Sequence, residues 1–349
     1  MKFSPQIVIG GKKISEQGRV FVIAEAGVNH GGNMELAKQM IDVAAEAGAD
    51  AVKFQNFKAQ GLILRDVQKA PYQKRTSDAS ETQYDMLQRL EVKKEDNIML
   101  QEYCRKREIL FLSTPFEEES LRELCDMDVP AIKIAATDIT NIQFLRQVAK
   151  KGKPIILSAG MCYLEEVSKA LEAIGEFNQE VILLQCSANY PIKDSEANLR
   201  VIRTFQKEFG ILTGYSDHSV GIGAAPYAVA AGARLIEKHF TLDRNMEGPD
   251  HKASVEPDEL REMILRIRQV EEYLGNEVKM PTLSEQFTRK SLQKCIVAKR
   301  QIKCGEIFTE DNLTSKRTNG MGISALYYDY VVGSQAGRDY ETDALIEVE

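Results

Sequence analysis

Two stretches decide the fold expected of this chain: Gly214-Tyr215-Ser216-Asp217-His218-Ser219 and Glu237-Lys238-His239-Phe240. Each follows a short apolar run, at 210–213 and 233–236, and a helix-period segment of small residues lies between them at 221–232. This order predicts a strand, a crossover helix and a second parallel strand. Adjacent parallel strands would bring His218 and His239 close enough to share a divalent metal. The alternative is that each histidine is an ordinary hydrogen-bonded side chain at a barrel mouth.

The same alternation of apolar runs and helix-period segments begins at residue 21 and closes at residue 274. The expected strands are 21–25, 51–55, 109–113, 131–135, 154–158, 181–185, 211–215 and 234–238. The expected helices include 34–47, 96–107, 117–127, 141–151, 163–177, 198–209, 221–232 and 257–274. Eight such units predict an α/β protein with a (β/α)8 TIM barrel. A doubly wound open sheet is the alternative, but no GxGxxG follows the first strand.

Composition excludes several classes of protein. The chain has 349 residues, of which 43% are hydrophobic and 28% charged, and this balance argues against a disordered or membrane protein. The net charge of −7 argues against a nucleic-acid partner. The sequence contains no run of eighteen apolar residues and no signal-peptide core. Six scattered cysteines without a CxxC pair fit reduced thiols, so a cytoplasmic location is expected.

Polar residues gather at the carboxyl ends of the expected strands, where a barrel of this class builds its active site. They are Glu25, Asn29, His30, Lys53, Gln55, Ser113, Thr114, Lys133, Thr137, Asp138, Ser158, Ser187, Asn189, Tyr190, Ser216, Asp217, His218 and His239. Lys53 and Lys133 stand in otherwise apolar strands, where a lysine is costly to bury unless it is paired. The pattern predicts an anion site for phosphate or carboxylate beside a metal. The alternative is that each lysine side chain extends to the solvated rim of the barrel, which is more plausible for one lysine than for two at equivalent strand ends.

The remaining segments complete the expected organisation. An N-terminal β-hairpin is expected over 6–23, from the β-rich runs 7–9 and 20–23, and a long lid or binding loop over 57–94, which contains Lys69-Ala70-Pro71-Tyr72-Gln73-Lys74. Asp250, in Gly248-Pro249-Asp250-His251-Lys252, is expected over the barrel mouth. The barrel with its hairpin is assigned to 1–275, a polar linker to 276–290 and a small domain to 291–349.

Ordered motifs along the whole chain resemble the bacterial sialic acid synthase family. They are IAEAGVNHGG, AVKFQNFKA, LSTPF, KGKPIILSAGM, GYSDHS, GARLIEKHFTLD and GPDHKAS, followed by RKSL, IKCGEIFTEDN and SKRTNG. The last group resembles the antifreeze-like (SAF) domain of that family. The resemblance implies condensation of phosphoenolpyruvate with an N-acyl-mannosamine-type sugar to a nine-carbon 2-keto acid. It also implies Mn²⁺ or Mg²⁺ as cofactor and a domain-swapped homodimer whose small domain caps the partner's barrel.

The resemblance assigns roles to individual residues. His218 and His239 match metal ligands, and Glu25 and Asp138 match catalytic positions. The residues that match phosphoenolpyruvate-binding positions are Lys53, Thr114, Lys133, Ser158 and Ser216. Thr137 is expected to replace a missing serine contact to the phosphate, and Ser187 flanks Ala188, where some members have a phosphate-binding residue. The residues on the sugar side are Gln55, Tyr190, Asp250 and Arg317, the last of which would reach the partner's site. The chain departs from the family at Ala136-Thr137-Asp138, where Ser-Gly-Glu is usual, at Ala188, and at Thr318 in place of a proline.

The residue types suit a condensation of this kind. The metal would polarise the aldehyde oxygen of the open-chain sugar, and the two lysines would hold phosphoenolpyruvate. N-acetylmannosamine, giving N-acetylneuraminate, is the first sugar expected, and 2,4-diacetamido-2,4,6-trideoxymannose, giving legionaminate, is the alternative. A Schiff-base aldolase that uses Lys133 or Lys53 as nucleophile is a second enzyme class. A sugar-binding or coat-assembly protein that has kept the fold is the non-enzymatic alternative, with Ala136 and Ala188 as its only indications.

Overall fold

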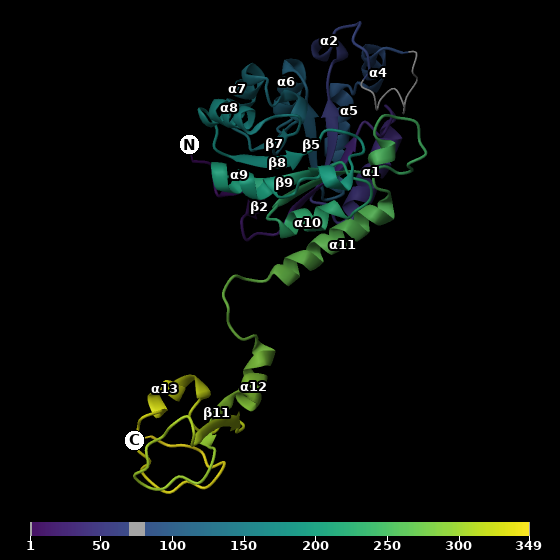
Figure 1. Ribbon diagram of the computed structural model, residues 1–349. Helices are drawn as coiled ribbons and strands as arrows, with labels where there is room; N and C mark the ends of the chain where they lie inside the picture. The colour runs from purple at the N-terminus through teal and green to yellow at the C-terminus, as the bar shows by residue number, and fades with distance from the viewer. Residues whose placement is uncertain (1, 70–80, 349) are drawn as a thin grey trace. The chain divides into compact units, whose positions relative to one another are not determined.

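The computed structural model describes residues 2–69 and 81–348, which form two compact units, Met1–Gly275 and Asn276–Glu349 (Figure 1). Each unit has its own buried core. None of the helices in the described residues has the length and apolar character needed to cross a membrane.

The first unit contains an eight-stranded parallel sheet. Its strands are β3 (Phe21–Gly27), β4 (Ala51–Asn56), β5 (Leu110–Pro115), β6 (Ile132–Ile134), β7 (Ile155–Ala159), β8 (Val181–Cys186), β9 (Leu212–Asp217) and β10 (Leu235–His239). The ladder runs β5-β4-β3-β10-β9-β8-β7-β6, and β5 also lies beside β6. The predicted (β/α)8 barrel is therefore confirmed, and the open doubly wound sheet is wrong.

Most of the helices surround the barrel and bury their apolar faces against it. They are α1 (Met34–Ala47), α2 (Ala59–Leu62), α4 (Gln83–Leu90), α5 (Lys94–Lys106), α6 (Glu118–Asp126), α7 (Ile142–Ala149), α8 (Leu164–Gly175), α9 (Val201–Phe209), α10 (Ala224–Ala230) and α11 (Pro257–Leu274). In α1, the residues at helical spacing Ala37, Met40, Ile41 and Ala44 are all buried. Asn33 caps its N-terminus and Gly48, at φ 85°, ends it.

An N-terminal hairpin closes the bottom of the barrel. Strands β1 (Gln6–Ile9) and β2 (Lys12–Ser15) pair antiparallel around Gly10-Gly11, both at positive φ. Ile7, Ile9 and Ile14 pack against the apolar residues at the amino ends of the barrel strands. The expected pairing of 7–9 with 20–23 is wrong, because the second run belongs to β3. The true partner strand was missed because only Ile14 of Lys12–Ser15 is fully buried.

Two segments that were expected to be loop or linker contain helices. Helices α2 and α4 lie in the expected loop 57–94, and residues 70–80, which include most of Lys69-Ala70-Pro71-Tyr72-Gln73-Lys74, are outside the described residues. In the second unit, helix α12 (Leu283–Leu292) occupies much of the expected linker. Thr282 and Glu285 form a capping box that begins it, a signal that the polar composition concealed.

The second unit is a small domain with one antiparallel ladder, β11 (Lys294–Ala298) with β12 (Leu313–Arg317), and a short helix α13 (Tyr328–Val331). Its core contains Ile296, Phe308, Leu313 and Tyr340, all nearly inaccessible to solvent. The structure therefore confirms a small folded domain at this end of the chain.

Candidate active site

A cavity of about 500 Å³ opens at the carboxyl ends of the barrel strands. Each of the eight strands contributes to its lining. The polar or ionisable strand residues that line it are Glu25, Lys53, Gln55, Thr114, Lys133, Ser158, Cys186, Ser216, Glu237 and His239. Parallel strands end at one edge of the barrel, so alternate inward positions from eight separate segments converge there.

The two lysines and two carboxylates form a buried ionic cluster. The Nζ atom of Lys53 lies 2.7 Å from a carboxylate oxygen of Glu25 and 3.7 Å from Glu237. The Nζ atom of Lys133 lies 3.4 Å from Glu237. All four side chains are at most 4% exposed. Glu237 therefore lies between two cations in a region that excludes water, where ionic interactions are strong.

Burial and the opposing charges shift the pKa values in this cluster. Burial lowers the pKa of Lys133, and Glu237 offsets only part of that effect. Burial would also lower the pKa of Lys53, but Glu237 and Glu25 outweigh it and raise this pKa above its ordinary value. The same lysines hold the pKa of Glu237 at about 2, against the effect of its burial. Burial raises the pKa of Glu25 to about 7, which suits a group that exchanges protons near neutral pH.

Three hydroxyls orient the charged groups. Lys53 donates to Thr114 Oγ1 at 2.9 Å, and Lys133 donates to Ser158 Oγ at 2.8 Å. Ser216 donates to Glu237 at 2.9 Å. Each hydroxyl comes from a neighbouring or facing strand, so the barrel itself fixes the geometry of the lysine pair. These distances place Lys53, Thr114, Lys133, Ser158 and Ser216 together, as the sequence predicted.

The two histidines lie side by side at the ends of β9 and β10. Their ring centroids are 5.4 Å apart, and the Tyr190 ring lies 4.1 Å from His218 and 5.4 Å from His239. His218 Nδ1 lies 2.8 Å from the carbonyl oxygen of Ser187, so it donates there and the Nε2 lone pair is left available. Burial lowers the pKa of His218 to about 4 and that of His239 well below its ordinary value. Both imidazoles are therefore neutral and able to bind a metal near neutral pH.

The histidine pair fits a divalent metal that other molecules help to coordinate. His239 Nδ1 is buried and has no hydrogen-bond partner among the described residues. No group of three or more histidine, cysteine, aspartate or glutamate side chains in 2–69 and 81–348 is arranged to hold a metal. Two neutral imidazoles alone leave coordination positions for water or substrate oxygen, as a catalytic metal requires.

A buried ion pair behind the barrel wall supports the histidine loop. Lys238 and Asp217 are fully buried and lie 3.0 Å apart. Lys238 also donates to the carbonyl of Ser219 at 2.6 Å, and Ser219 donates through its amide and hydroxyl to Asp217. These bonds fix the backbone on both sides of His218, which explains the charged residues around each histidine in the sequence.

The sugar-side residues expected from the sequence divide between the two units. Gln55, Tyr190 and Asp250 line the cavity, and Gln55 donates to Glu25 at 3.3 Å. Burial raises the pKa of Asp250 to about 6. Arg317 ends β12 in the second unit and is exposed, so its expected role in a partner's site remains a prediction.

Thr137 lines the cavity, whereas Asp138 and Ser187, to which the resemblance gave roles, do not. Asp138 is absent from the described lining and accepts a hydrogen bond from Asn141, the N-cap of α7, at 3.1 Å. Ser187 is also absent from the lining: its hydroxyl donates to the carbonyl of Glu196 at 2.7 Å, and its own carbonyl orients His218. The structure therefore places both in positions that support the site rather than in its lining.

Glu237 is the central residue that the sequence analysis did not assign. A signal for it exists, because Glu237 precedes His239 by two residues and strand alternation points both side chains to the same face. The apolar part of the lining was also missed. It includes Val28, Phe57 and Phe116 after β3, β4 and β5, and Leu62, Met86, Leu87 and Leu90 from helices α2 and α4.

Comparison with known proteins decides the family. The model of the NeuB family matches residues 40–279, and the model of the SAF domain matches residues 293–347. The chain belongs to the NeuB family.

Relatives of this NeuB-family protein are similar over nearly the whole chain. The N,N'-diacetyllegionaminic acid synthase of Campylobacter jejuni is 45% identical over 94% of this chain and 99% of its own. The enzyme of the same name from Legionella pneumophila is 40% identical over 90% of each chain. A solved structure of an N-acetylneuraminic acid synthetase from Leptospira borgpetersenii, in complex with citrate, has a TM-score of 0.74 and 37% identity and covers 83% of this chain and 98% of its own. The NeuB-family protein is therefore a nonulosonic acid synthase by family.

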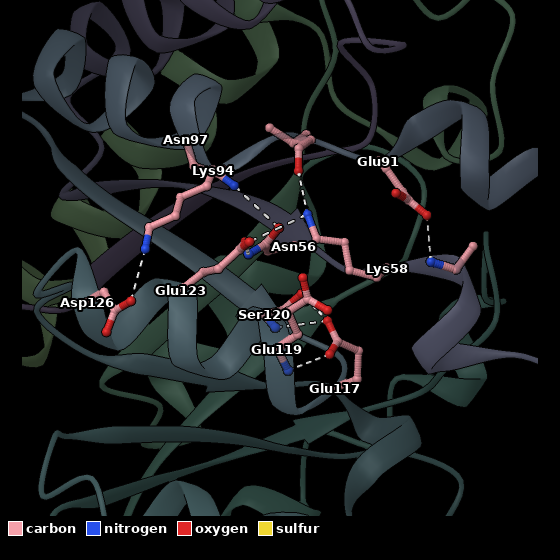
Figure 2. A network of polar contacts seen from close by, with 12 residues as sticks. Asn56, Lys58, Glu91, Lys94, Asn97, Glu117, Glu119, Ser120, Glu123 and Asp126 are labelled. Atoms are coloured by element: carbon pink, nitrogen blue, oxygen red, sulfur yellow. Dashed lines mark hydrogen bonds and ion pairs between the residues drawn. The ribbon is translucent and has the colours of Figure 1, made fainter.

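A polar network anchors the apolar side of the NeuB-family cavity (Figure 2). Glu91 accepts from the Ala59 amide at 2.7 Å, at the beginning of α2. Lys58 donates to the carbonyl of Val92 at 3.3 Å and lies 3.7 Å from Glu123 of α6. Glu123 also accepts from Asn56 at 3.1 Å. The network ties α2 and the end of α4 to the outside of the barrel, so their apolar side chains are held over its mouth.

Proposed function

We propose that this protein condenses phosphoenolpyruvate with 2,4-diacetamido-2,4,6-trideoxymannose to give N,N'-diacetyllegionaminate and phosphate. The observation that carries the proposal is the buried Lys53–Glu237–Lys133 cluster, which shares one cavity with the histidine pair. The two legionaminic acid synthases, at 45% and 40% identity, favour this sugar over N-acetylmannosamine. N-acetylmannosamine, giving N-acetylneuraminate, is the second candidate, supported by the 37% identity to the Leptospira synthetase.

The lysines bind and orient phosphoenolpyruvate. Its phosphate and carboxylate carry several negative charges, and Lys53 and Lys133 offer two buried cations with hydroxyls on either side. Glu237 offsets the positive charge of the two lysines and competes with phosphoenolpyruvate for them. When phosphoenolpyruvate binds, its anionic groups therefore replace Glu237 as a partner of the lysines. Fixing the phosphoenolpyruvate in this way directs its C3 toward the aldehyde carbon of the sugar.

The sugar is oriented at the histidine side of the cavity. A divalent metal held by His218 and His239, Mn²⁺ or Mg²⁺, supplies Lewis-acid polarisation of the aldehyde oxygen when bound. Tyr190 lies against both histidine rings, and Asp250 lines the same cavity, so both would hold sugar hydroxyl or amide groups. Gln55, which donates to Glu25, would do so as well.

Glu25 is placed to handle protons. Attack of C3 on the aldehyde leaves an oxocarbenium ion at C2, water adds there, and phosphate leaves with cleavage of the C–O bond. The water gives up a proton as it adds. Glu25, with its pKa at about 7 and Lys53 beside it at 2.7 Å, can accept that proton at neutral pH. Asp138 bonds Asn141 instead, so Glu25 is the better candidate for this role.

Phosphate release tests the proposal. The enzyme is incubated with phosphoenolpyruvate, Mn²⁺ and one of three sugars: N-acetylmannosamine, 2,4-diacetamido-2,4,6-trideoxymannose or the pseudaminate precursor. We expect release to be fastest with the second sugar and to stop on treatment with EDTA. Fastest release with N-acetylmannosamine would support the second candidate, and no release with any sugar would contradict the synthase function.

A Schiff-base aldolase is separated from this mechanism by trapping. The lowered pKa of Lys133 would suit a nucleophilic amine, so this class is tested directly. We expect borohydride with either substrate to leave the protein mass unchanged, because the condensation forms no covalent enzyme adduct. A mass increase that disappears in Lys133→Met would overturn the proposed mechanism. A cytoplasmic location, expected from the scattered cysteines, and a homodimer, expected from the family resemblance, belong to the same proposal.

A further inference from the structure

We infer that the apolar wall of the cavity binds the C6 methyl group of the sugar and selects 6-deoxy substrates over sugars with a C6 hydroxyl. We define the apolar wall as Val28, Phe57, Leu62, Leu87, Leu90 and Phe116. This inference rests on the proposed function and adds to it the residues that contact C6 of the sugar.

Phe57 and Phe116 of the wall lie across the barrel mouth from Tyr190 and His218. In the ring of strands, β4 and β5 stand opposite β8 and β9. Phe57 and Phe116 follow β4 and β5, whereas Tyr190 and His218 follow β8 and β9. A sugar whose aldehyde faces the histidines can therefore extend its far end across the mouth toward Phe57 and Phe116. The atom farthest from the aldehyde is C6.

One face of α4 forms much of the wall. Gln83, Met86, Leu87 and Leu90 are spaced at three and four residues, and all four line the cavity. Gln83 is the polar member of this face, at the first turn, and Leu87 stands one turn farther along. Leu62 of α2 packs with Leu87 in the same apolar cluster as Phe57 and Phe116. Leu87 and Leu90 on this face can therefore cover a methyl group of the sugar.

The chemistry of the wall discriminates between a methyl and a hydroxymethyl group. Its side chains offer carbon atoms to the sugar and no hydrogen-bond donor or acceptor. A methyl group gains from leaving water there, whereas a hydroxyl loses its water partners without replacement. Hydrophobic pockets of this kind discriminate by roughly 10- to 200-fold for a difference of one small group.

A matched pair of sugars isolates the effect. The substrates are 2,4-diacetamido-2,4,6-trideoxymannose and its 6-hydroxy counterpart, which differ only by the oxygen at C6. We expect the wild-type kcat/KM to favour the 6-deoxy sugar by roughly 10- to 200-fold. In Leu87→Gln the ratio should fall at least fivefold, mainly through a higher KM for the 6-deoxy sugar. The KM for phosphoenolpyruvate should stay unchanged, because the lysine cluster is intact.

Two further variants keep the test decisive. Leu62→Gln changes the wall from a different helix, and should shift the ratio in the same direction if Leu87→Gln fails to fold. Leu64→Gln is the control, because Leu64 is 79% exposed and is absent from the described lining. It should leave the ratio at the wild-type value.

A second pair of sugars distinguishes C6 from the N-acyl methyl groups. These sugars keep the C6 methyl group and carry a formyl or an acetyl group at N4. If the wall variants change the formyl-to-acetyl ratio and leave the C6 ratio alone, the wall reads an acyl group and our inference is wrong. An unchanged C6 ratio in both folded variants would also overturn it. If the wild-type enzyme releases no phosphate with any sugar, the proposed function fails, and this inference fails with it.

Discussion

Lys53 and Lys133 are the buried cations on which we expect the binding of phosphoenolpyruvate to depend. Each is held by a hydroxyl and a carboxylate and is almost inaccessible to solvent. We predict that Lys53→Met and Lys133→Met each raise the KM for phosphoenolpyruvate at least tenfold. A charge-assisted hydrogen bond in a dry site contributes about 1.5 to 3 kcal/mol, and 1.4 kcal/mol is a factor of ten. The KM for the sugar should change much less.

Steady-state kinetics with each substrate varied in turn measures this difference. Lys12→Met is a suitable control, since Lys12 is an exposed partner of Asp50 at the opposite end of the barrel. Unchanged KM for phosphoenolpyruvate and unchanged kcat in both cavity variants would contradict the anion-binding role.

The ionisation of the buried Asp250 makes the stability of the folded protein depend on pH. Burial raises its pKa from 3.8 to about 6, so the ionised carboxylate costs the folded state free energy. This cost is fully present above pH 6, decreases as pH falls, and vanishes below the unfolded pKa near 4. We predict that Asp250→Asn stabilises the metal-free protein by about 3 kcal/mol at pH 8, and that the difference disappears by pH 4.

Thermal unfolding at pH 8, 6 and 4 in EDTA measures the Asp250 effect. Asp66→Asn, which removes a carboxylate from an exposed position, serves as the control. A variant less stable than wild type at pH 8 would mean that the Asp250 carboxylate is favourably paired. The same substitution should also impair sugar binding above pH 6, where the wild-type carboxylate is ionised.

The Lys58–Glu123 contact acts at the scale of elements, because it joins the segment before α2 to α6 (Figure 2). Both side chains are less than one-fifth exposed. We predict that Glu123→Gln raises the KM for the sugar roughly three- to tenfold, corresponding to about 1 kcal/mol, and leaves the KM for phosphoenolpyruvate unchanged. The reason is that α2 and the apolar wall lose one of their anchors, whereas the lysine cluster does not.

Helix α6 also supplies a matched control. Asp126 pairs with Lys94 at 2.9 Å, with side chains 55% and 38% exposed, and this pair does not touch α2. Asp126→Asn removes one ion pair from the same helix at the surface, where such pairs contribute little. Equal effects of the two variants on the KM for the sugar would show that the network does not position the wall.

Elements with a clear hydrophobic period could be predicted from the sequence, and the others could not. All eight barrel strands and helices such as α1 and α11 lie where apolar periodicity placed them. Strand β2 and helices α2, α4 and α12 were missed, because all four are short and because β2 and α12 carry mostly polar residues. In α12 none of the residues is buried, so capping residues rather than an apolar face begin the helix.

The part of the candidate site that the barrel strands supply could be predicted from the sequence, because the carboxyl ends of the strands converge at one edge of the barrel. Lys53 and Lys133 lie within β4 and β6, His218 directly follows β9 and His239 ends β10, so the convergence of these side chains follows from the barrel. Asp138 and Ser187 were also expected at strand ends, but Asp138 accepts a hydrogen bond from the side chain of Asn141, and the Ser187 hydroxyl donates to the carbonyl of Glu196. The apolar wall could not be predicted, because it depends on how α2 and α4 fold over the mouth.

At the scale of the whole molecule, the exposed Arg317 tests whether the small domain completes a site in another subunit. We predict that Arg317→Ala and His218→Ala are each nearly inactive and that mixing them restores part of the activity. The expected reason is that a mixed dimer contains one site with both residues intact. Arginine suits this role because its guanidinium donates several hydrogen bonds to an acyl oxygen at once.

Subunit exchange must be shown by mass spectrometry of differently labelled chains before activity is compared. If mixed dimers form and no activity returns, a site shared between subunits is excluded. Arg338→Ala serves as the control, because Arg338 is an exposed arginine of the same domain that pairs with Glu347. It should remain active without mixing.

The N-terminal hairpin has a kinetic consequence. Ile7, Ile9 and Ile14 fill the bottom of the barrel, so both reactants must enter, and both products must leave, through the one mouth. The lysines proposed to hold phosphoenolpyruvate are buried at the closed end of the cavity, and the sugar is proposed to bind nearer its opening. A sugar that binds first would block the access of phosphoenolpyruvate to the lysines. Turnover should therefore follow a compulsory order, phosphoenolpyruvate before sugar, and a dead-end sugar analogue should inhibit uncompetitively against phosphoenolpyruvate.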